Sequence, residues 1–164
     1  MPLRFLRIAV LSCVVAACEP FTEVLGPTHY SAQLLGANVK PGAVTTAGTG
    51  TLTVSWDPVD KTLAYTLGYS RLEAAATSLH LHGPANANGV ADALVDFGNP
   101  PGQMFEIVLG ETGSATGRID LTLPITPTVS GDSLVVLLQR GLLYVDVHTS
   151  ANAAGEIRGN VREN

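Results

Sequence analysis

The sequence contains little cysteine, little charge and no apolar run long enough to span a membrane as a helix. Its cysteines are Cys13 and Cys18, too few for the several disulfides that hold many small secreted domains together. Charged residues make up 14% of the chain, and the formal net charge is −5. A nucleic-acid-binding protein needs clustered Lys and Arg to neutralise phosphates. We therefore expect neither a disulfide scaffold nor a nucleic-acid partner.

The amino-terminal segment has the layout of a secretory signal peptide. Arg4 and Arg7 precede an apolar stretch over residues 8–17, which is shorter than the roughly 20 residues of a membrane-spanning helix. Residues 15–18, Val-Ala-Ala-Cys, resemble the lipobox of bacterial lipoproteins. In that family the signal is cut before the cysteine, which carries the lipid. The resemblance implies lipidation of Cys18; an ordinary cleavable signal with a chance cysteine is the alternative.

Three segments follow from this interpretation. We expect a lipoprotein signal peptide over residues 1–17, a tether over 18–28 and one domain over 29–164. The protein would be secreted across the inner membrane and held by its lipid at the outer membrane or cell surface. The membrane is then one partner, and an unidentified protein or glycan of the cell envelope is the other that we expect.

Alternation of polar and apolar residues dominates the rest of the chain. Period-two segments at a spacing of about ten residues, separated by Gly- and Pro-rich turns, are typical of antiparallel sandwiches and barrels. Asp132 or Ser133 is expected to be the N-cap of a short helix that runs through Gln139 and stops at Gly141. We therefore predict an all-β fold, an antiparallel Greek-key or immunoglobulin-like β-sandwich with one short helix. The strands are expected near residues 49–56, 62–69, 77–82, 90–97, 104–109, 117–123, 142–148 and 156–161.

Histidines supply the clearest chemistry. His80 and His82 are two residues apart on an expected strand, so both imidazoles point to the same face. His148 ends another strand, and Asp146 lies on the same face of that strand. If the two strands are neighbours, a site with three histidines could bind one copper or zinc ion, provided that the imidazole nitrogens converge within about 3–4 Å. The alternative is that these histidines are hydrogen-bonded structural residues.

Two stretches resemble the CHRD (chordin) domain family. They are residues 80–85, His-Leu-His-Gly-Pro-Ala, and residues 143–159, which begin Leu-Tyr-Val-Asp-Val-His-Thr and end Gly-Glu-Ile-Arg-Gly. The resemblance covers about residues 29–162. It departs at residues 38–42, where the family usually has a Val-Pro-Pro stretch, and at Asp146, where Asn is usual.

The resemblance implies a secreted or lipid-anchored module. No catalytic activity is established for the family, so the resemblance assigns none to this chain. Glu156 and Arg158 match family positions, and we interpret them as a cross-strand charge pair, with contact to a ligand as the alternative. The chain has no Gly-x-Ser-x-Gly elbow. The sequence thus favours a lipid-anchored, non-enzymatic binding or structural module with no certain cofactor. The alternative is a copper- or zinc-binding or redox protein that uses His80, His82 and His148.

Overall fold

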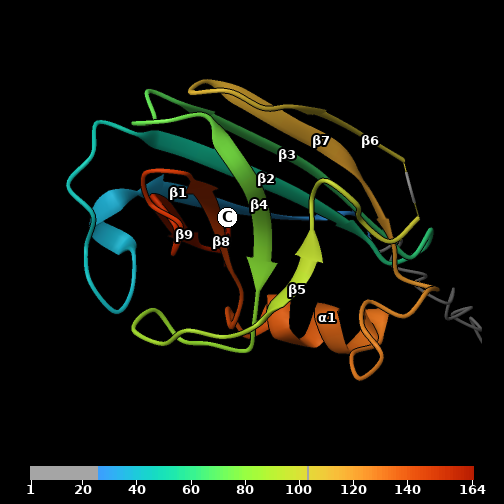
Figure 1. Cartoon of the computed structure of the whole chain (residues 1–164). Helices are drawn as coiled ribbons and strands as arrows, with labels where there is room; N and C mark the ends of the chain where they lie inside the picture. The colour runs from blue at the N-terminus through green and yellow to red at the C-terminus, as the bar shows by residue number, and fades with distance from the viewer. Residues whose placement is uncertain (1–25, 103) are drawn as a thin grey trace, which may run out of the picture.

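The computed structural model describes residues 26–102 and 104–164. Within them the chain forms antiparallel strands, a short 3₁₀ helix and one α-helix (Figure 1), which confirms the expected all-β fold. The expected signal peptide, Cys18 and most of the tether lie outside the described residues. The elements are β1 (Thr28–Leu35), η1 (Gly36–Asn38), β2 (Thr49–Asp57), β3 (Thr62–Ser70), β4 (Ala76–His82), β5 (Ala93–Asp96), β6 (Met104–Val108), β7 (Gly113–Asp120), α1 (Gly131–Gln139), β8 (Tyr144–Thr149), β9 (Ile157–Asn160) and β10 (Arg162–Glu163).

The strands of the described residues form one curled sheet. Its order is β5-β4-β8-β9-β1-β2-β3-β7-β6, and β10 also pairs with β1. The expected hairpin between β2 and β3 is present, with Thr53 opposite Thr66. The expected closing hairpin pairs β8 with β9. β1 joins the two halves, because it pairs with β2 along its whole length and with β9 at one end.

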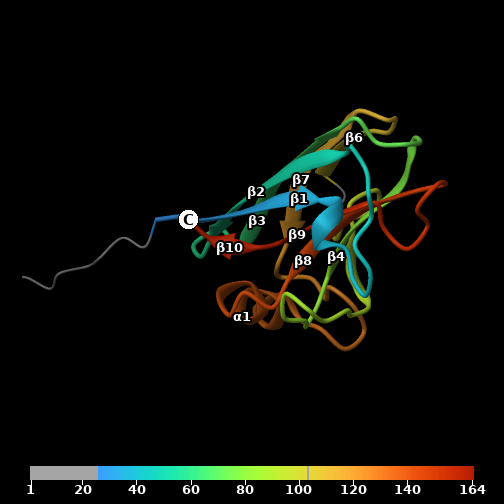
Figure 2. The ribbon, with the colours of Figure 1, turned by 90° about the vertical axis from the view of Figure 1, so that its left-hand side faces the viewer.

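The two halves of the sheet face each other across one hydrophobic core. Strand β4 contributes Leu79 and Leu81, and β8 contributes Val145 and Val147. From the opposite half, β2 and β3 contribute side chains of the same cluster, including Leu52, which is fully buried. Figure 2 shows β2 and β3 on one side of this core, with β8 and α1 on the other. Because side chains alternate along a strand, the residues between the buried ones of β4 and β8 point away from the core.

Helix α1 closes one end of this core with Leu134 and Leu138. Its N-cap is Ser130, whose hydroxyl accepts a hydrogen bond from the Ser133 amide at 3.2 Å, so the predicted cap at Asp132 or Ser133 is wrong by two or three residues. Ser130 has extended backbone angles and its carbonyl oxygen accepts from the Leu134 amide, as an N-cap requires. Gly141 does end the helical segment, in the left-handed region at φ 63°.

Two further boundaries differ from the sequence prediction. Strand β7 begins at Gly113 rather than residue 117 and ends at Asp120. The apolar residues that follow it lie in a turn, where the Asp120 carboxylate accepts from the Thr122 amide at 2.9 Å. Among the residues that the structure describes, no helix is both long and apolar enough to span a bilayer.

Candidate metal centre

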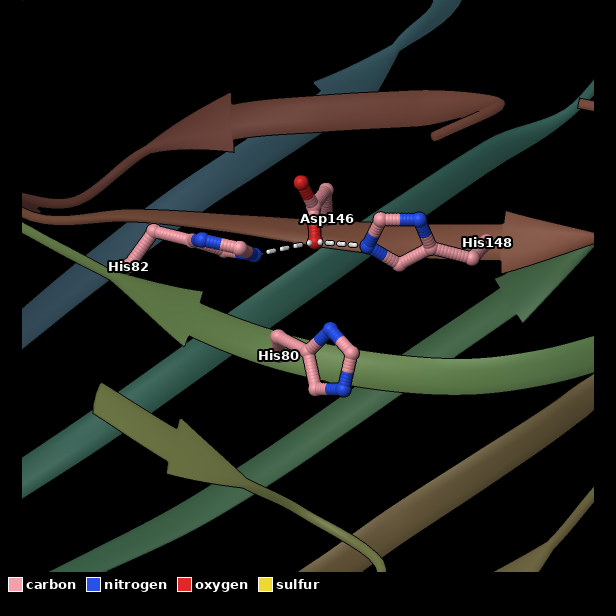
Figure 3. A group of neighbouring side chains, drawn as sticks. All are labelled: His80, His82, Asp146 and His148. Carbon is pink, nitrogen blue, oxygen red and sulfur yellow. Dashed lines mark hydrogen bonds and ion pairs between the residues drawn. The ribbon is translucent and has the colours of Figure 1, made fainter. Parts of the chain in front are cut away.

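Two histidines of β4 and two polar residues of β8 meet on the sheet face that points away from the core (Figure 3). In the β4–β8 register His80 lies opposite Asp146, and His148 follows two residues later on the same face of β8. The structure thus brings together His80, His82 and His148 and adds Asp146. One ligand atom from each of the four lies within 4.8 Å of the others, which is wider than the 3–4 Å anticipated for a metal-bound cluster.

Asp146 lies between two of the imidazoles. Its Oδ1 atom is 3.0 Å from Nε2 of His82 and 2.9 Å from Nε2 of His148. His80 lies beside this trio, with one ring nitrogen turned toward Asp146 in Figure 3. The ring centroid of His80 is 5.0 Å from that of His148 and 5.6 Å from that of His82. Three imidazoles and one carboxylate therefore surround one point.

The other ring nitrogen of His82 and that of His148 are held by the backbone. Nδ1 of His82 donates to the carbonyl oxygen of Ala91 at 2.9 Å, and Nδ1 of His148 donates to that of Ala153 at 3.0 Å. A carbonyl oxygen only accepts, so the proton of each neutral ring must be on Nδ1. This is the arrangement by which metal-binding histidines are usually oriented, with Nε2 left free as the ligand.

With the protons on Nδ1, the Asp146 carboxylate faces two nitrogen atoms that have no proton to donate. In neutral His82 and His148 both Nε2 atoms carry lone pairs, and the ionised carboxylate between them also offers only lone pairs. The contacts at 2.9 and 3.0 Å are therefore favourable in two cases. Either the imidazoles are protonated, or a cation lies between the three atoms. A bound metal ion supplies the second case without charging either ring.

Shifts of the pKa values follow from this crowding. Burial lowers the pKa of His80, and the neighbouring His148 lowers it further, so His80 is held neutral with a lone pair available to a metal. The hydrogen bond to Asp146 raises the pKa of His148, against the opposing effect of burial. Burial alone would raise the pKa of Asp146, but its hydrogen bonds with His148 and His82 lower it below the ordinary value. Asp146 is therefore ionised at neutral pH.

Comparison with known families identifies the fold around this cluster. The family model described as "CHRD domain" matches residues 30–161. The chain belongs to the CHRD domain family. No curated protein and no solved structure gives a significant match. The match begins at the third residue of β1 and extends past the end of β9, so the four residues of the cluster lie inside the CHRD domain. The departure that we expect at Asp146 falls in the cluster itself.

Two loops of the CHRD domain supply the carbonyl groups that orient the imidazoles. The β4–β5 loop carries Ala91, whose amide donates to the Tyr144 hydroxyl at 3.2 Å. The β8–β9 loop carries Ala153 and is fixed by Glu156, a fully buried carboxylate that accepts from the Thr149 hydroxyl at 2.8 Å. The metal-ligand candidates thus stand on strands, while the groups that fix their orientation come from loops.

The predicted charge pair between Glu156 and Arg158 is wrong. Glu156 accepts from the hydroxyl groups of Thr46 and Thr149, and the Arg158 guanidinium instead lies over the ring of Tyr144, 3.5 Å from its centroid. In the parts of the chain that the structure describes, Asp146 is the only acidic residue at ion-pair distance from a basic side chain, and its partners are His82 and His148. Sequence reasoning missed Tyr144, although its spacing of two residues from Asp146 placed it on the same face of β8.

Proposed function

We propose that this CHRD domain binds one transition-metal ion, copper or zinc, and that the protein is a lipid-anchored, non-enzymatic component of the cell envelope. The metal proposal rests on one observation: Oδ1 of Asp146 faces two Nε2 atoms whose rings both donate Nδ1–H to backbone carbonyls. Three nitrogen ligands and one carboxylate suit copper and zinc, whereas calcium and magnesium prefer oxygen ligands alone.

The cluster needs only a modest adjustment to bind such an ion. Ligands at 2.0–2.1 Å from a tetrahedral ion lie about 3.3 Å from one another. The separations of 2.9 and 3.0 Å around Asp146 would open by a few tenths of an ångström, and His80 would move inward. His82 is buried, while His80 and His148 are half-buried. The ion would therefore be held at the protein surface rather than in its core.

The proposed cellular location of the protein is supported by the sequence alone. The arginines, the apolar segment and Cys18 are the features from which we infer export and lipid attachment, with the membrane as the partner of the lipid. We further predict that the domain binds a protein or glycan of the cell envelope.

Metal content is the first test of this proposal. After loading with Zn²⁺ or Cu²⁺ and removal of free metal, we expect elemental analysis to find about one ion per chain. A variant carrying both His80→Ala and His82→Ala should retain none. His29→Ala is the matched control, because His29 is exposed at the start of β1 and pairs with Ser55 of β2. Equal metal in both variants, or none in the unmodified protein, would show that the histidines have a structural role only.

A further inference from the structure

Three side chains form a layered stack across β4, β8 and β9. Tyr144 lies opposite His82 in the β4–β8 register, and the two rings are parallel within 2° at a centroid separation of 4.7 Å. Arg158 of β9 places its guanidinium carbon 3.5 Å from the centroid of Tyr144. Because β8 lies between β4 and β9, the tyrosine ring is the middle layer of the stack.

Tyr144 also fixes the far side of His82. Its hydroxyl donates to the carbonyl oxygen of Ala91 at 3.1 Å and accepts from the amide of the same residue at 3.2 Å. That carbonyl oxygen is the acceptor for Nδ1 of His82. The ring face and the Nδ1 proton of His82 are therefore both held by contacts that depend on Tyr144.

Arg158 brings a buried positive charge next to the cluster. Its side chain is among the largest fully buried ones, with 2% of its surface exposed. Its Nη2 atom donates to the carbonyl oxygen of Asn86 at 3.5 Å, and its buried Nε atom has no partner among the described residues. Arginine keeps its charge in proteins. In the β8–β9 register Arg158 is directly opposite Asp146, and its guanidinium lies over the Tyr144 ring that stacks on His82.

We propose that Tyr144 and Arg158 are positioning residues of the metal centre and that the charge of Arg158 biases it toward monovalent copper over divalent ions. The inference rests on the proposed function. The repulsion between a fixed unit charge and a bound ion is proportional to the charge of the ion, so Cu²⁺ and Zn²⁺ are penalised twice as much as Cu⁺. Burial of the guanidinium limits screening by solvent. The proposal concerns equilibrium affinity and includes no electron-transfer step.

Dissociation constants for Cu⁺, Cu²⁺ and Zn²⁺ test the role of the charge. They would be measured by competition with chelators of known affinity, with Cu⁺ handled anaerobically. In the Arg158→Gln variant we expect the ratio of the dissociation constant for Cu²⁺ to that for Cu⁺ to fall about tenfold. This is the size expected for a unit charge separated from the ion by the Tyr144 and His82 rings, at an effective dielectric constant of about 20. Zn²⁺ binding should tighten in parallel with Cu²⁺. Arg158→Lys, which keeps the charge, should leave the ratio close to that of the unmodified protein.

A purely structural role for Arg158 predicts a different pattern. Loss of packing would weaken the binding of all three ions alike, in the Gln and Lys variants both, and an unchanged ratio would overturn the inference while leaving the metal site intact. If Arg158→Gln does not fold, Arg158→Met removes the charge with an apolar chain of similar length and answers the same question. Failure of the unmodified protein to bind any of the ions would instead overturn the proposed function, and this inference with it.

A tyrosine variant tests the positioning role separately. Tyr144→Leu removes the middle layer and the hydroxyl contacts to Ala91, and we expect it to weaken the binding of every ion by about 10–100-fold, the usual cost of losing a group that orients a metal ligand. Tyr144→Phe keeps the ring and should show a smaller loss. Unchanged affinity in a folded Tyr144→Leu protein would show that Tyr144 does not position His82.

Discussion

Asp146→Asn is expected to weaken Zn²⁺ or Cu²⁺ binding by at least about 100-fold while the metal-free protein keeps its fold. Loss of a residue that only hydrogen-bonds to a metal ligand already lowers metal affinity by about 10–100-fold. Asp146 would bind the ion directly through a charged oxygen, so its loss should cost more. An asparagine amide can turn its two N–H groups toward Nε2 of His82 and Nε2 of His148. These are the atoms that now lie 3.0 and 2.9 Å from Oδ1 of Asp146. The substitution therefore satisfies the imidazoles without a cation.

Asp96→Asn is the matched control for this experiment. Asp96 pairs with His80 from the neighbouring strand β5, but its carboxylate is exposed and accepts from the Gly98 amide at 2.8 Å. The same loss of one negative charge at this position should change metal affinity only a few-fold, because exposed charges are screened. Calorimetric titration gives both affinities, and thermal unfolding of the metal-free proteins checks the fold. Equal metal affinity in the Asp146→Asn and unmodified proteins would show that Asp146 is not a metal ligand.

Glu156→Ala is expected to lower the free energy of unfolding by about 3–5 kcal/mol, because hydrogen bonds to a buried carboxylate are strong and their donors would be left unpaired. The Glu156 side chain is fully buried. Its carboxylate accepts from the Thr46 hydroxyl at 2.6 Å, the Glu73 amide at 2.8 Å and the Thr149 hydroxyl at 2.8 Å. These donors come from three separate segments, so one side chain fixes all of them.

Denaturant unfolding at neutral pH measures this loss, with Glu106→Ala as the control. Glu106 is exposed on β6, where removal of a carboxylate should change stability by less than about 0.5 kcal/mol. Since the β8–β9 loop also presents the Ala153 carbonyl to His148, the Glu156 variant should bind metal less tightly as well. A loss of stability no larger than that of the control would contradict the role we assign to this carboxylate.

Glu156 also makes the stability of the fold depend on pH. Burial alone would raise the pKa of Glu156, but the hydrogen bonds from Thr46, the Glu73 amide and Thr149 outweigh it and lower the pKa below its usual range. A carboxyl whose pKa is lower in the folded state stabilises the fold above its unfolded pKa, and the stabilisation is lost as the pH falls through the folded pKa. Glu156→Gln should therefore show a smaller decrease in stability on acidification than the unmodified protein.

Local patterns in the sequence were sufficient for much of the fold. Alternation placed β2 and β3 correctly as neighbours, and the spacing of His80 and His82 placed both rings on one face. The sequence pattern misplaces the start of α1 because Asp132 and Ser133 are also residue types that favour the N-cap position. Ser130 is the N-cap because the preceding loop ends there in the structure. Such a choice is set by tertiary structure, which a local pattern does not contain.

The candidate site was also predictable only in part. Spacing within one strand was enough to select His80 and His82, and the roles of His148 and Asp146 depended on the pairing of β4 with β8. The contacts of Arg158 depend on the pairing of β8 with β9 and on which ring the guanidinium reaches, whereas the sequence pattern suggested a charge pair. The buried Glu156 shows the same limit, since its donors are as much as 110 residues away in the chain.

The most direct test of the metal centre is anomalous diffraction from crystals of the protein loaded with copper or zinc. We predict one anomalous peak, bonded to Nε2 of His82, Nε2 of His148 and Oδ1 of Asp146 at about 2.0–2.2 Å, with a nitrogen of His80 completing the set. Both Nδ1 atoms should keep their bonds to the carbonyls of Ala91 and Ala153. A peak elsewhere on the molecule, or no peak in loaded crystals, would contradict the metal centre and leave these histidines as structural residues of the sheet.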